Sequence, residues 1–293
     1  PITILSISFA ILFPPYDVVM MFKILVLQRL YNLSDDQTEY QINDRMSFMR
    51  FLGINLCDKV PDAKTIWKFK NDLAETETVD KLFCMFDEHL EKEGLISHKG
   101  TIVDATFVDA PRQRNSRDEN KKIKNGEIPE EWEKPENKSK LAQKDIDAYW
   151  TKKNGERHFG YKDHVKCDAD SKLITNYSVT SASVHDSQRC LVFIDQEDEV
   201  LYAASAYSGK PIALALPENC KNQICEKGYR NSPLTSEQKM NNRRKSRIRC
   251  RIEHIFGFMT GAMHGITIRS IGITRAWMNI GITNLVYNLC RYS

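Results

Sequence analysis

The sequence predicts an α/β protein in which an all-helical N-terminal region precedes a mixed sheet flanked by helices. Three observations carry this prediction. Apolar residues recur at helical spacing up to Gly94, β-branched runs of strand length follow Gly100, and short strands alternate with helices toward the C-terminus. A chain of 293 residues can bury a sizeable core. We expect a helical domain at 1–94 and an α/β domain at 95–293.

Composition narrows the class of protein. A hydrophobic fraction of 41% and a charged fraction of 28% are typical of soluble globular proteins. The eight cysteines form neither a CxxC pair nor a zinc-finger spacing, which argues against structural zinc and favours a reducing cytoplasm. Residues 1–16 carry no charge, but they are too short for a membrane span and lack the cationic start of a secretory signal. We expect no membrane contact, and we expect native residues upstream because the chain begins without Met.

Residues 17–93 are expected to be wholly helical. Ser34 and Gln37 have the spacing of a capping box that opens a second helix, and Pro61-Asp62 is the start signal for a third. The aromatic residues of this region recur at helical spacing and are expected in the core. The first helix carries an apolar stripe of Val18, Met21, Phe22, Leu25 and Leu30.

Beyond Gly100 the periodicity becomes that of strands. Residues 101–109 predict a buried strand, and 157–167 and 173–182 predict a hairpin that turns at 168–172. Between them, a charged insertion at about 111–153 is rich in Lys, Glu and Asn. Such a stretch is either an ordered surface insertion or a mobile loop.

The first hairpin strand alternates apolar and cationic side chains. Its apolar positions are Phe159, Tyr161, Val165 and Cys167, and its cationic positions are His158, Lys162, His164 and Lys166. A charged, solvated outer face is the ordinary interpretation of this pattern. A face that contacts DNA is the sharper one, and it makes Lys162, His164 and Lys166 candidate DNA-binding residues.

The remaining elements are shorter. A helix at 188–194 with Asp186 as its cap, a strand at 199–203 and a second α/β unit at 211–230 are expected. Thr235 and Gln238 are spaced to open a long basic helix. A last amphipathic helix contains Ala276, Trp277, Ile280 and Leu285.

The basic helix concentrates charge that the net value of +3 hides. Residues 239–251 contain seven cations and no acid, which indicates either a solvated helix face or a nucleic-acid contact. On the second interpretation, the candidate DNA-binding residues are Arg243, Arg244, Lys245, Arg247, Arg249 and Arg251.

Two carboxylates stand in unlike settings. Asp104 lies inside an apolar strand, where a charge is otherwise costly, and Glu253 follows the basic run one turn after Arg249. Taken singly, Asp104 is a buried structural acid and Glu253 a partner of Arg249. Together, a buried acid and an acid embedded in phosphate-binding charge indicate a metal site that acts on a nucleic-acid backbone.

Several ordered motifs resemble the insertion-sequence-five family of transposases, over about residues 16–290. They are Ile102–Pro111, Phe159–His164, Ser183–Ser187, Leu201–Gly209 and Arg251–Gly257. The resemblance implies an RNase H-like core with a DDE triad, and two Mg²⁺ ions, with Mn²⁺ as the alternative. It also implies endonuclease and strand-transfer activity on double-stranded DNA, at transposon ends and target. A homodimer on DNA, associated with the nucleoid of the bacterial cytoplasm, would then be expected.

Matched to the family motifs, Asp104 is the first acid of the triad, Glu253 is the last, and both are metal ligands. The second acid falls at Ala204, so we expect the chain to be nearly inactive. An engineered Asp-to-Ala change that traps DNA uncut is the explanation we favour, and a naturally decayed element is the alternative. Ser246 and Thr260 stand where relatives often carry Tyr and Lys.

Three functions are therefore open: a DNA transposase, a DNA-binding protein that has lost catalysis, and an RNase H-like metal-dependent nuclease. In each, we expect the Asp104 and Glu253 carboxylates and the Ala204 Cβ to lie within about 8 Å of one another. We also expect the cations of 239–251 and those of the hairpin strand to form one DNA-binding surface around that cleft.

Overall fold

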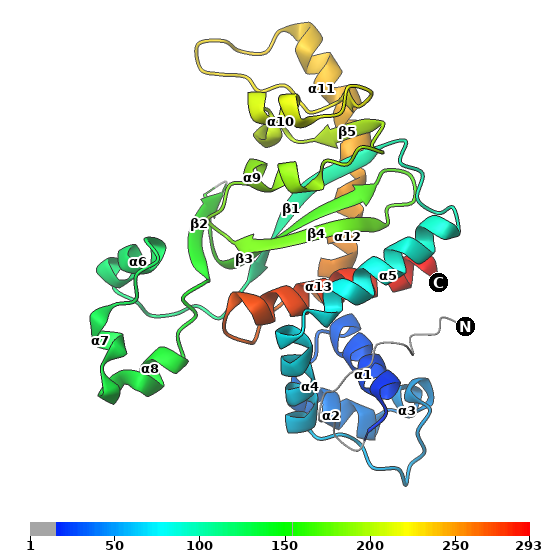
Figure 1. Ribbon diagram of the computed structural model, residues 1–293, viewed down its shortest axis with the longest axis vertical. Coiled ribbons are helices and arrows are strands. Elements are labelled where there is room, and N and C mark those ends of the chain that lie inside the picture. The colour runs from blue at the N-terminus through cyan, green and yellow to red at the C-terminus, as the bar shows by residue number, and fades with distance from the viewer. Residues whose placement is uncertain (1–15, 154) are drawn as a thin grey trace.

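In the computed structural model, which describes residues 16–153 and 155–293, a helical region packs against one face of a mixed sheet (Figure 1). Most of the uncharged N-terminal stretch, residues 1–15, lies outside the described residues. Within the described ranges, no helix is both long enough and apolar enough to cross a membrane. All eight cysteines are free thiols.

The N-terminal region is helical, as the sequence predicts. Asp17 caps the first helix, Ser34 and Gln37 form the expected capping box, and Asp62 accepts a hydrogen bond from the Thr65 amide at the start of the fourth helix. The helices are α1 (Val18–Leu30), α2 (Asp35–Asp44), α3 (Met46–Leu52), α4 (Ala63–Glu75) and α5 (Thr78–Lys92).

The sheet has the strand order that an RNase H-like core requires. Its strands are β1 (Thr101–Asp109), β2 (Tyr149–Lys153), β3 (Glu156–Asp168), β4 (Ile174–Ser181), β5 (Val200–Ala203) and β6 (Lys221–Asn222). β3 lies antiparallel to β1 and β4, while β5 and β6 continue on the other side of β1 in parallel. The predicted α/β fold with a mixed sheet flanked by helices is confirmed.

Gly160 permits β3 to approach β1. Its φ is +145°, and a Cβ at this position would lie 2.3 Å from the Val108 carbonyl oxygen. No side chain fits in that space, so the glycine of the Phe159–His164 motif has a structural reason.

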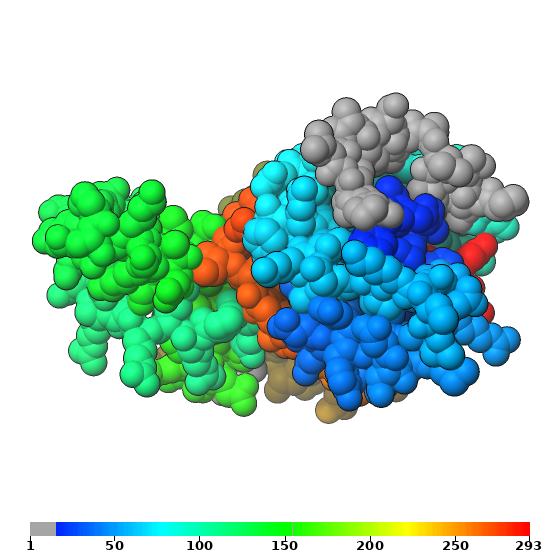
Figure 2. All heavy atoms as spheres, turned by 90° about the horizontal axis from the view of Figure 1, so that it is seen from below, coloured from blue at the N-terminus to red at the C-terminus, as the bar shows by residue number. Residues whose placement is uncertain are grey.

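The segment between β1 and β3 contains the short helices α6 (Arg117–Lys124), α7 (Glu130–Glu133) and α8 (Lys138–Ala142). They enclose Trp132, which is fully buried and donates from Nε1 to Glu119 at 2.8 Å. Of the two alternatives for this segment, the structure has the ordered insertion. Figure 2 shows it as a green lobe, with orange α13 (Ile273–Tyr292) between it and the N-terminal helices.

Helix α13 lies at the centre of the largest hydrophobic core, which joins the N-terminal helices to one face of the sheet. Only an amphipathic helix was expected here, but α13 is buried on nearly all sides from Ala276 to Asn288. Its buried amides are bonded across the core: Asn284 donates to Asp163, and Asn288 bonds both backbone groups of Ile174.

The opposite face of the sheet has its own smaller core around Val103, Leu201 and Tyr207. The elements that follow β4 contribute to it: α9 (Ser187–Cys190), η2 (Leu191–Phe193), η3 (Ser205–Tyr207) and α10 (Lys210–Ala215). The expected basic helix is divided at Cys250 into α11 (Ser236–Arg249) and α12 (Arg251–Thr260). Both faces of the sheet are therefore covered.

Asp163 gives the fold a testable pH dependence. It is fully buried beneath α13, and burial raises its pKa to about 8 against the opposing hydrogen bond from Asn284. Because the folded-state pKa exceeds the unfolded one, wild-type stability should fall as pH rises from about 4 to about 8. We expect Asp163→Asn to gain stability relative to wild type by a few kcal/mol across that window. Urea unfolding at several pH values measures this, with exposed Asp44→Asn as the control.

A pH-independent difference between Asp163→Asn and wild type would contradict this prediction, because it would mean that the Asp163 carboxyl has the same pKa in the folded and unfolded states.

Candidate functional site

Asp104 and Ala204 lie side by side at the junction of β1 and β5. The parallel register pairs Thr101 with Leu201, Ile102 with Tyr202 and Val103 with Ala203. Asp104 and Ala204 are the next residues on their strands, so they are level with each other where β5 ends. The third position expected to belong to the site, Glu253, comes from the first turn of α12.

One guanidinium links the two carboxylates. Arg249, the last residue of α11, donates from Nη1 to Asp104 Oδ2 at 2.8 Å and from Nη2 to Glu253 Oε1 at 3.0 Å. The Asp104 side chain is 17% exposed and that of Glu253 is 60% exposed. The structure therefore brings the buried strand acid and the surface helix acid to the same cation, next to Ala204.

Burial and hydrogen-bond donors have opposite effects on the pKa of Asp104. Burial raises the pKa of Asp104, and the Ala105 amide, at 2.9 Å from Oδ1, and the Arg249 guanidinium oppose that rise. A carboxylate at this depth needs such compensation, because an unpaired buried charge is strongly unfavourable.

Tyr207 is a neighbour of the site that the sequence analysis did not single out. Its side chain is buried, and its hydroxyl has no hydrogen-bond partner among the described residues. Burial and the charge of nearby Asp104 raise its pKa, while Arg249 lowers it. The only sequence signal was its place in the Leu201–Gly209 motif, three residues after Ala204.

The residues present do not fit a site for two divalent ions. Hard cations take six or more oxygen ligands, and each carboxylate supplies two at most. Over residues 16–153 and 155–293, no group of three or more His, Cys, Asp or Glu side chains is arranged to hold a metal. The Ala204 methyl stands next to Asp104 and offers no further ligand, and Arg249 already pairs with both of the acids present.

The prediction of an exposed cationic face on β3 is wrong. Lys162, His164 and Lys166 are 7%, 0% and 6% exposed, because α9, η2 and η3 cover this face of the sheet. Lys162 pairs with Asp186 at 2.7 Å and Lys166 with Asp198 at 2.9 Å. These side chains are interior ion pairs, and they add nothing to a DNA-binding surface.

His164 and Asp186 also differ from their predicted roles as a DNA-binding residue and a helix cap. His164 Nε2 lies 2.8 Å from the Thr180 hydroxyl, and burial lowers its pKa to about 4, so the ring is neutral at physiological pH. Asp186 was expected to cap a helix, yet its side chain makes no capping hydrogen bond. Instead it accepts from Lys162, whose Nζ also donates to the Val184 carbonyl at 2.6 Å.

Some cations of residues 239–251 bond to other parts of the protein, and others are exposed without an ion pair among the described residues. Lys245 donates to the Ile224 carbonyl at 2.9 Å, and Arg251 donates to Asp170 at 2.9 Å and to the Ala169 carbonyl. Four exposed cations on α11 have no ion pair among the described residues: Lys239, Arg243, Arg244 and Arg247. Lys239, Arg243 and Arg247 line a groove. The positive charge available to an external anion near this site is therefore on α11.

Comparison with known proteins shows the family of this chain. The family model described as "Transposase DDE domain" matches residues 96–289, and that described as "Transposase domain (DUF772)" matches residues 13–72. The chain is similar to the cryo-EM structure of the piggyBac transposase synaptic complex with hairpin DNA, at 11% sequence identity and a TM-score of 0.43. That similarity covers 93% of this chain and 65% of the other. Because the first model spans most of the chain, this protein belongs to the family of DDE-domain transposases.

Proposed function

We propose that this chain is a DNA transposase of the insertion-sequence-five type that binds the double-stranded ends of its element but does not cut them. The observation that carries the proposal is the alignment of Ala204 with Asp104 on neighbouring parallel strands, beside the Arg249 link to Glu253. Two acids from a strand and a helix converge there, and the position next to Asp104 offers only a methyl group.

The chemistry of the reaction supports the inactive state. Phosphodiester cleavage and strand transfer develop negative charge on the attacking and leaving oxygens, which two divalent ions such as Mg²⁺ or Mn²⁺ stabilise in the active enzymes of this class. An aspartate at position 204 would add a third carboxylate to Asp104 and Glu253. In the present chain, the reaction has no such support, and the remaining activity is DNA binding.

The free cations of α11 supply that binding. Arg243, Arg244 and Arg247 are exposed and unpaired beside the site, which suits contacts to backbone phosphates. A homodimer that holds two ends is part of the same proposal. A second candidate, a repressor that descends from a transposase and binds DNA without catalysis, is favoured by the same alanine at position 204.

We predict that Ala204→Asp gives Mg²⁺- or Mn²⁺-dependent cleavage of cognate ends, whereas Ala204→Asn does not. Asn has a similar shape to Asp but lacks the negative charge. The comparison therefore tests whether the chain fails to cut because a negatively charged ligand is missing. DNA affinity should be similar in all three proteins, apart from a modest advantage for those without the added acid. Cleavage of labelled ends measures the effect, and supplying a 3′-hydroxyl end and a target plasmid tests strand transfer.

Robust cleavage by the chain with Ala204 would mean that another residue supplies the second acid. If Ala204→Asp folds and binds DNA but still fails to cut, the repressor candidate would be favoured.

We predict that charge reversal at Arg243 and Arg244 weakens DNA binding at least tenfold and flattens its salt dependence. Each lost phosphate contact removes about one released counterion from the slope of log affinity against log salt. Anisotropy titrations over a range of salt concentrations measure both quantities. Reversal of two exposed lysines on α5, Lys81 and Lys92, is the matched control. An unchanged slope for the Arg243 and Arg244 variant would leave α11 as a merely solvated helix.

A further inference from the structure

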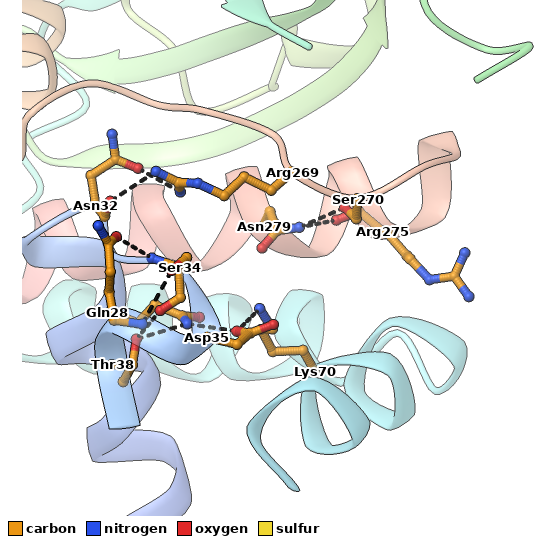
Figure 3. Close-up of polar contacts among 11 residues, drawn as sticks. Gln28, Asn32, Ser34, Asp35, Thr38, Lys70, Arg269, Ser270, Arg275 and Asn279 are labelled. Carbon is orange, nitrogen blue, oxygen red and sulfur yellow. Dashed lines mark hydrogen bonds and ion pairs between the residues drawn. The ribbon is translucent and has the colours of Figure 1, made fainter. Parts of the chain in front are cut away.

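A second cationic pocket lies in the N-terminal region, between α1, α2, α4 and the start of α13. Its lining includes four cations, Arg29, Lys70, Arg269 and Arg275, and two acids, Asp35 and Asp36. In Figure 3, Arg269 approaches from the segment before α13 and Lys70 from α4, and both reach the junction of α1 and α2. In Figure 1, α2 and α4 lie at the opposite end of the molecule from α11.

Most polar groups of the pocket are fixed by neighbours. Arg269 donates to the side-chain and backbone oxygens of Asn32 at 3.0 Å each, and Arg275 donates from Nε to Asn71 at 2.6 Å. Asp35 Oδ1 accepts from both Lys70 and Gln28. The acid that faces the cluster is thereby engaged, and the cations outnumber the acids.

Arg29 is the exception. It is 7% exposed, and among the described residues its guanidinium makes no hydrogen bond and has no carboxylate within ion-pair distance. Burial and the repulsion of Arg269 lower its pKa to about 10, against the attraction of Asp35, which lies beyond ion-pair distance and is bonded to Lys70 and Gln28. Burial lowers the pKa of Lys70 too, and both arginines add to the effect. A buried guanidinium without a partner is strongly unfavourable, which indicates a position prepared for an anion from outside.

The surface beside the pocket favours a nucleic acid over a small anion. Trp67 lines the pocket and is 54% exposed. Lys64, one turn before Trp67 on α4, and Lys68, the residue after Trp67, are both exposed. An exposed indole with lysines nearby on the same helix, next to a cationic pocket, matches the combination of stacking and charge that binds nucleic-acid chains.

We propose that this pocket is a second DNA contact, in which a backbone phosphate binds the buried Arg29 guanidinium together with Arg269 and Lys70. The inference rests on the proposed DNA-binding function and places a contact at the end of the molecule remote from the Asp104–Arg249–Glu253 site. Nothing covalent occurs in the pocket; its role is to hold and orient the duplex.

The test uses the full chain, double-stranded DNA and the variant Arg29→Met, which keeps the length of the side chain but removes its charge. We expect about tenfold weaker binding and a salt slope reduced by about one phosphate contact. The free variant should unfold at a temperature no lower than wild type, because an unpaired buried charge has been removed. Arg269→Gln, at an exposed position, should weaken binding in the same direction and serves if Arg29→Met fails to fold.

The matched control is Arg50→Gln, which removes one exposed charge from α3 outside the pocket. Binding by Arg29→Met and Arg269→Gln that equals binding by this control would overturn the inference, while the proposed function would stand. Inorganic phosphate, compared with chloride at equal ionic strength, forms a second arm and should raise the unfolding temperature of wild type but not of Arg29→Met. Phosphate protection without any effect of Arg29 on DNA affinity would identify a small-anion site and refute the DNA contact.

If the wild-type chain binds no DNA, the proposed function fails, and the DNA contact in this pocket fails with it. The unfolding temperature in phosphate then shows whether the pocket binds an anion at all, because a rise in wild type but not in Arg29→Met would still establish an anion site at Arg29.

Discussion

The Arg249 guanidinium is the contact on which the candidate site depends. Asp104 lies too deep to remain charged without a partner, and Glu253 belongs to a different helix, so a single cation fixes the sheet relative to α11 and α12. With a methyl group at position 204, two acids and one guanidinium leave the cluster with one net negative charge. An acid at position 204 would raise that to two, so the methyl group reduces the repulsion among the acids that Arg249 positions.

The face of the sheet opposite α13 contains buried ion pairs as well as apolar contacts. Lysines on β3 reach acids in the segments before and after α9, so this layer combines a small apolar core with the pairs Lys162–Asp186 and Lys166–Asp198. Buried pairs of this kind contribute little net stability, but the loss of one partner is severe. They fix the segment that leads into β5, and with it the place of Ala204 beside Asp104.

Local signals in the sequence were sufficient for the helix starts at Ser34 and Asp62 and for β1, β3, β4 and β5. They were not sufficient for α3, or for β2, which lies in the stretch expected to be an insertion or a loop. Asp104, Ala204 and Glu253 were singled out by their motifs, and the structure brings them together where β5 ends beside the middle of β1. The burial of the β3 lysines was not predictable. Alternation of apolar and cationic side chains along a strand shows that the two faces of the sheet differ, but it does not show whether other elements cover both faces. The pocket at Arg29 was missed for a related reason: its residues come from α1, α4 and the segment before α13, and no local pattern joins them.

The position of α13 has a consequence for how the chain folds during synthesis. This helix is translated after every element it packs against, including α1, α4 and α5, and it fills the centre of their shared core. Until it leaves the ribosome, the earlier helices and one face of the sheet expose apolar surface that has no local partner. Contacts of such long sequence separation slow folding and prolong the time during which this apolar surface is exposed to aggregation.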